Sequence, residues 1–180
     1  MRKQTFSTAV VGWILSLLTE SKRQDMIPAK YPLQKIKPFA YLVFITGAVI
    51  TKLEPQRLQS VNEEMTQLRN YDMSISEDWV EQVEEIRKGL GEKTSDPYFI
   101  WVDGETADAV KSKKRGLNLE HIEKIGMLSF HYGCIFGARY PERVESMFQA
   151  DRQRGMKAGA GLSWKDLVED AKDILKEHSL

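Results

Sequence analysis

Residues Ile125–Ala138 read IGMLSFHYGCIFGA, fourteen positions without a formal charge. The stretch contains the only cysteine, Cys134, and one of the three histidines, His131. Its small residues recur at spacings of three, four and four, which puts all of them on one face of a helix. They are Gly126, Ser129, Gly133 and Gly137. Because a face without large side chains lets another backbone approach closely, the stretch predicts a central packing helix.

The composition is that of a single globular domain, which we predict to span residues 1–180. The apolar fraction of 42% is ordinary for such a protein, and the charged fraction of 29% is slightly high. One cysteine excludes an internal disulfide framework and a zinc site built from several thiolates, and it fits a reducing, cytoplasmic compartment. Basic and acidic residues both number 26, whereas dedicated nucleic-acid-binding proteins usually carry a basic excess.

The charges are unevenly distributed along the neutral chain. Residues Met1–Leu53 sum to +6, residues Glu54–Asp96 to −6, and residues Pro97–Leu180 to 0. The first two segments are expected to face each other within one fold or to form solvated surfaces. The alternative is complementary pairing between subunits, or an acidic patch that binds a basic partner.

Three uncharged runs raise the question of a membrane: Thr5–Thr19, Phe39–Thr51 and Ile125–Ala138. Each is shorter than the roughly 20 residues that a spanning helix needs. The first run follows Arg2 and Lys3, as in a signal peptide, but no small-x-small cleavage site follows it. We therefore predict three buried core helices and no membrane span.

Helical signals cover most of the chain. Pro38, Pro55 and Pro141 suit first turns of helices, because the fixed φ of proline is compatible there and its missing N–H is not needed. Ser163 with Asp166 resembles a capping box that opens the last helix. The expected helices are Thr5–Ser21, Pro38–Leu53, Pro55–Asn70, one capped by Ser74 or Ser76 and ending near Leu90, Leu119–Tyr140, Pro141–Gln153, and one after Ser163.

These signals predict an all-α fold, a compact bundle of about seven to eight helices around the central apolar helix. The segment at residues 98–102 is β-branched and aromatic, and it could be a short strand or a helix. A second stripe of small residues lies on the first predicted helix, at Thr8, Gly12, Ser16 and Thr19.

The residues best suited to chemistry are Glu123, His131 and Cys134, which form a candidate pocket between helices. Zinc normally needs three or four converging ligands, and the chain contains no Glu-x-x-His pair of the kind used by carboxylate-bridged metal bundles. A buried cysteine is more often a small apolar residue than a nucleophile. We therefore predict no catalytic residue, no metal and no cofactor.

Two basic clusters form a candidate interaction surface. The first, at residues 111–115, contains Lys111, Lys113, Lys114 and Arg115, and the second, at residues 152–157, contains Arg152, Arg154 and Lys157. Such clusters can neutralise nucleic-acid phosphates or hold another anion. No aromatic platform lies beside the first cluster, so a solvated loop before a helix is the favoured explanation for it.

The sequence thus favours a cytoplasmic helical interaction or scaffold protein that self-associates, on the basis of its small-residue stripes and its segregated charge. Two alternatives stay open. One is a nucleic-acid-associated protein that uses the two basic clusters. The other is a small helical enzyme or ligand binder with a pocket near His131 and Cys134.

Overall fold

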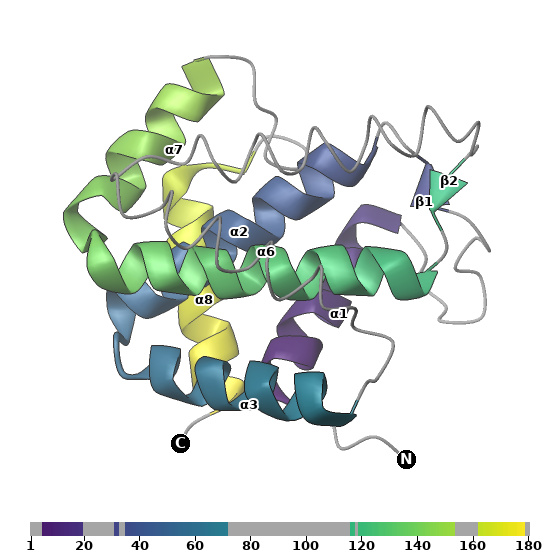
Figure 1. Ribbon diagram of the computed structural model, residues 1–180. Coiled ribbons are helices and arrows are strands. Elements are labelled where there is room, and N and C mark those ends of the chain that lie inside the picture. Colours follow the sequence, from purple (N-terminus) through teal and green to yellow (C-terminus); the bar gives the residue numbers. More distant parts are fainter. Residues whose placement is uncertain are drawn as a thin grey trace.

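A computed structural model describes residues 5–19, 31–32, 35–71, 116–117, 119–153 and 162–178, and nearly all of these are helical (Figure 1). The described α-helices are α1 (Phe6–Thr19), α2 (Ile36–Leu53), α3 (Arg57–Tyr71), α6 (Leu119–Arg139), α7 (Val144–Gln153) and α8 (Trp164–Glu177). A 3-10 helix, η4 (Pro141–Arg143), joins α6 to α7. The helical fold that the sequence predicts is confirmed for this part of the chain.

The centre of the fold is the pair α2 and α6, whose mutual contact is the most extensive between any two described elements. Figure 1 shows α6 lying across α2, with α7 on one side of the crossing and α1 and α3 on the other. Every residue of α2 from Phe39 to Thr51 is buried. A helix that is apolar on all faces belongs in a protein core, so α2 is a core helix together with α6.

The remaining helices cover this central pair, since α1, α3, α7 and α8 all contact α2. The amphipathic helix α8 shows how the covering works. Its buried residues recur at helical spacing and are Leu167, Ala171, Ile174 and Leu175. Its opposite face carries charged side chains, including Lys165 and Asp173.

The predicted capping box at the start of α8 is confirmed. The Ser163 hydroxyl accepts a hydrogen bond from the backbone N–H of Asp166 at 3.2 Å, and the Asp166 carboxylate accepts one from the backbone N–H of Ser163 at 2.8 Å. Hydrogen bonds from the Ser163 hydroxyl and backbone N–H lower the pKa of Asp166. The box satisfies donors that a helix N-terminus otherwise leaves without partners.

Helix boundaries differ from the predicted ones by a few residues. Helix α2 begins at Ile36, so Pro38 lies within its first turn, where proline is tolerated. Helix α3 begins at Arg57, because Glu54–Gln56 form a turn closed by a bond from the Arg57 N–H to the Glu54 carbonyl at 3.0 Å. Pro141 opens η4 before α7 continues the chain.

One short strand pairing was not predicted. Strand β1 (Tyr31–Pro32) pairs with β2 (Gly116–Leu117) in antiparallel fashion, with Tyr31 opposite Leu117. It lies where the chain enters α2 and α6, so it fixes the starts of the two central helices near each other (Figure 1). The predicted helix ending near Leu90 and the segment at residues 98–102 lie outside the described residues.

Candidate functional site

The small-residue stripe of α6 lies against neighbouring helices. All four of its members, Gly126, Ser129, Gly133 and Gly137, are buried. A Cβ atom at Gly133 would collide with the Phe44 carbonyl of α2, and one at Gly137 would collide with the Ala48 carbonyl. At Gly126 it would meet side chains instead, 2.6 Å from Val11 Cγ1 of α1. Helices of the same chain therefore already pack against this stripe of small residues.

Helix α2 approaches α6 equally closely from its own side. A Cβ atom at Gly47 would lie 2.6 Å from the Phe130 carbonyl oxygen. One turn later, the Thr51 hydroxyl donates to the Cys134 carbonyl at 2.8 Å, in addition to a local contact with the Gly47 carbonyl. The backbones of α2 and α6 are thus in direct van der Waals contact, and the Thr51 side chain adds a hydrogen bond between the two helices.

A group of polar side chains gathers where α1, α3 and α6 meet, and we call this group the polar junction: Ser7, Asn62, Glu64, His131 and Cys134. His131 Nε2 lies 2.7 Å from Asn62 Oδ1. The Glu64 carboxylate accepts the backbone N–H of Phe6 at 3.2 Å and that of Ser7 at 2.9 Å. A carboxylate at this position satisfies the first donors of α1 and complements its dipole.

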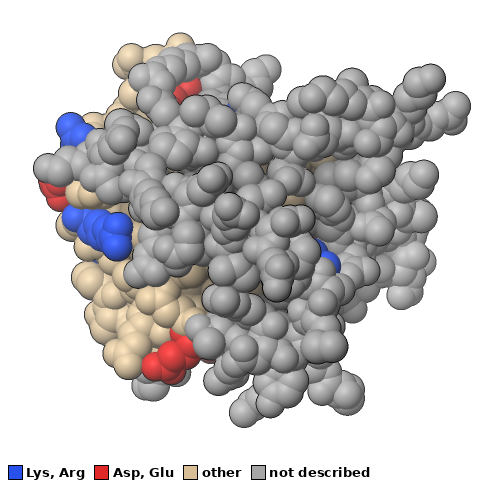
Figure 2. All heavy atoms as spheres, in the orientation of Figure 1, with Lys and Arg blue, Asp and Glu red and all other residues tan. Residues whose placement is uncertain are grey.

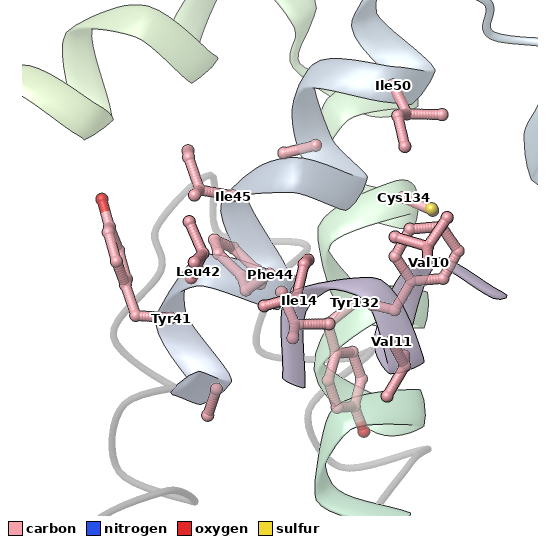
Figure 3. Close-up of a cluster of buried hydrophobic side chains, with 14 of the residues drawn as sticks. Val10, Val11, Ile14, Tyr41, Leu42, Phe44, Ile45, Ile50, Tyr132 and Cys134 are labelled. Carbon is pink, nitrogen blue, oxygen red and sulfur yellow. The ribbon is translucent and has the colours of Figure 1, made fainter. Parts of the chain in front are cut away.

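Cys134 is buried in the polar junction, as Ser7 is, and none of its surface is exposed (Figure 3). Burial raises the pKa of its thiol well above the ordinary value, and the negative charge of Glu64 raises it further. The thiol is therefore protonated at neutral pH. Because the thiolate is the form that attacks electrophiles and binds metals, this cysteine is suited to packing.

The predicted pocket residues do not converge. Glu123 is exposed, His131 is half-buried and bonded to α3, and Cys134 is inside the core. Cys134 lies eleven positions after Glu123 on one helix, which corresponds to about 16 Å along the axis. Within the described ranges, no group of three or more His, Cys, Asp or Glu side chains could hold a metal ion.

Of the predicted basic surface, only Arg152 lies in the described residues. It is exposed on α7, and its guanidinium lies over the Phe148 ring at 5.8 Å from the centroid. Figure 2 shows basic and acidic side chains close together on this side of the molecule, over α7 and the end of α6. Arg154, Lys157 and the cluster at residues 111–115 lie outside the described residues.

Two polar contacts in the core were not predicted from the sequence. The Tyr41 hydroxyl of α2 donates to the Asp151 carboxylate of α7 at 3.1 Å, and both residues are buried. Figure 3 shows Tyr41 extending away from the α1 side of the core. The second contact is the ion pair between Arg57 and Glu54. The Arg57 side chain lies in the first turn of α3 and is only 3% exposed. A cation is unfavourable at a helix N-terminus. The presence of an arginine in the first turn of α3 is therefore a sequence signal that its side chain has partners elsewhere in the fold.

No family model matches the chain, and no curated protein or solved structure shows significant similarity to it. One helix in the described part, α2, is long and apolar enough to cross a membrane by length and composition, and 78% of that 18-residue window is buried. A core helix passes the same test, so this property is a weak indication of a membrane span.

Proposed function

We propose that this chain is a helical interaction protein that self-associates as a homodimer through the outer face of α1. One observation carries the proposal: α1 is partly at the surface but contains no charged residue in its sequence FSTAVVGWILSLLT. Gly12 is exposed on it, and no described atom lies within 4 Å of where its Cβ would be. Surface helices of globular proteins normally carry polar and charged residues on the outer face.

The side chains around Gly12 suit contact with a second apolar surface. Thr8, Ala9 and Trp13 are each half-buried, so part of each reaches the surface. An exposed glycine among them permits close approach of another helix, as Gly133 does inside the core. In a two-fold symmetric dimer this face would meet its own copy.

The polar junction supports an interaction role over a catalytic one. The Glu64 carboxylate binds the start of α1, and His131 bonds to Asn62 of α3. The Cys134 thiol is held in its protonated form by burial. The contacts of Glu64 and His131 thus connect helices, which is the use expected in a scaffold.

The proposal extends to the whole chain and its location. It places residues 1–180 in one domain of about seven to eight helices, including the one predicted to end near Leu90. It also assigns the chain to the cytoplasm, without a membrane span. The burial of α2 and the single buried cysteine support this assignment.

Sedimentation equilibrium of wild type and Gly12→Arg tests the association. Two arginines facing each other across a two-fold axis repel, so Gly12→Arg should weaken dimerisation at least about tenfold. Gln149→Arg, which adds the same charge at an exposed position of α7, is the matched control and should leave the dimer intact. A strictly monomeric wild type at high concentration would refute the proposal, as would a Gly12→Arg dimer of unchanged affinity.

The nucleic-acid alternative retains one structural observation, the exposed guanidinium of Arg152. Phosphate contacts are strongest at low salt and weaken steeply as salt rises. Fluorescence anisotropy with labelled single-stranded and duplex oligonucleotides at low salt tests it. Binding that weakens with salt and is reduced in Arg152→Gln favours the alternative, and absence of binding at low salt removes it.

A further inference from the structure

Arg57 occupies a position between three helix ends. Its Nε donates to the Glu54 carboxylate at 3.0 Å, and its Nη2 donates to the backbone carbonyl of His178 at 2.7 Å. Its guanidinium also lies over the Phe6 ring, 4.9 Å from the centroid. A buried arginine requires such partners, because an uncompensated charge inside a protein is strongly destabilising.

Each partner lies at the end of a different helix. Glu54 is the C-cap residue of α2, Phe6 is the first residue of α1, and His178 is the C-cap residue of α8. The carbonyls of a helix C-terminus lack partners within the helix, and a cation is the favoured group there. Arg57 therefore satisfies the end of α8 while it lies on the start of α1.

Phe6 and His178 also touch each other directly. Their ring centroids are 5.5 Å apart in an edge-to-face arrangement, and Phe6 packs in the same way on Phe130 of α6. If the end of α8 moved away, Arg57 would lose a hydrogen-bond acceptor and Phe6 would lose a ring neighbour. If the start of α1 moved away, Arg57 and His178 would both lose the Phe6 ring.

We propose that Arg57 is a clasp that makes the docking of the α1 start and of the α8 end mutually dependent. Two contacts that share one residue are expected to be energetically coupled. Loosening of α8 is then transmitted to the first turns of α1 through Arg57. This coupling is a property of the monomer. It does not depend on the proposed self-association.

Hydrogen–deuterium exchange of the full chain tests the clasp, with peptides covering residues 6–12 and 170–178. Arg57→Met keeps most of the apolar stem and removes the guanidinium. Loss of its charge-assisted bonds should raise exchange at both ends about tenfold or more. Lys165→Met removes an exposed cation that pairs with Glu169 at 3.8 Å on α8, and it should change neither peptide.

Ser163→Ala tests the transmission, because it weakens α8 at the end opposite to the clasp. It should raise exchange in residues 6–12 in the wild-type background, but add nothing there in the Arg57→Met background. The clasp is refuted if Arg57→Met loosens only α8, or if Ser163→Ala acts on residues 6–12 equally in both backgrounds. Should Arg57→Met fail to fold, Phe6→Leu is the substitute. It must raise exchange in residues 170–178, and unchanged exchange there would also refute the clasp.

Discussion

The glycines of α6 and Gly12 of α1 belong to similar sequence patterns of small residues but have opposite surroundings. Gly133 and Gly137 of α6 lie against carbonyls of α2, with no space for a methyl group. Gly12 of α1 is exposed, and no described atom would touch its Cβ. The comparison teaches that glycine spacing on an apolar helix predicts close packing only where a neighbouring helix lies over that face.

Gly133→Ala should produce the largest effect. Its new methyl group collides with the Phe44 backbone, which cannot rotate away as a side chain can, so α2 and α6 must separate. We expect a loss of at least about 3 kcal/mol in the free energy of unfolding, or failure to fold. Urea denaturation followed by circular dichroism measures it. A near-neutral result would contradict the close contact of α6 with α2.

Gly126→Ala should have an intermediate effect. Its methyl group would meet the ends of side chains, Val11 and Phe39, instead of backbone. Both residues are buried and the valine is stiff at χ1, so relief is partial. We expect a loss of about 1–2 kcal/mol in unfolding free energy by the same assay. A cost as large as that of Gly133→Ala would show that α1 holds α6 as rigidly as α2 does.

Thr51→Val removes the hydrogen bond that crosses from α2 to the Cys134 carbonyl. The matched control is Thr46→Val, since the buried Thr46 hydroxyl donates to the Leu42 carbonyl of its own helix at 2.7 Å. We expect Thr51→Val to cost about 1 kcal/mol more than Thr46→Val in thermal or urea unfolding. Equal costs would mean that the hydroxyl contributes nothing across the helix contact.

Gly12→Ala should have the smallest effect and the opposite sign. Alanine is the better helix former, and the site has open space for its methyl group, so unfolding free energy should rise by about 0.5–1 kcal/mol. The comparison must be made at a concentration where the chain is monomeric, because dimerisation would add to stability. Destabilisation of the monomer would indicate that Gly12 is packed.

Much of the described fold follows from local sequence signals. The uncharged run at Ile125–Ala138 predicted the central helix, and Ser163 with Asp166 predicted the start of α8 to within a residue. These signals act between neighbours in the chain. The β1–β2 pairing was missed because each strand has only two residues and no alternating pattern marks it.

The polar contacts could be predicted less well than the helices. The sequence marks His131 as a candidate site residue, but its partner Asn62 lies 69 positions away, and helix spacing does not reveal such a contact. The same holds for Tyr41 with Asp151 and for Arg57 with His178. Their pairing depends on how whole helices cross, which is decided by packing of the core and not by any local pattern.

The most direct test of the central claim compares Gly137→Ala with Gly12→Ala in urea unfolding at two widely separated protein concentrations. The claim is that helices of the same chain close the small-residue face of α6, and that at Gly137 this neighbour is α2. It predicts that Gly137→Ala is strongly destabilising relative to wild type, by an amount that does not depend on concentration, whereas Gly12→Ala stabilises the monomer. If the cost of Gly137→Ala were small, or appeared only at high concentration, the face would be closed by another copy or left open, and the account would be wrong.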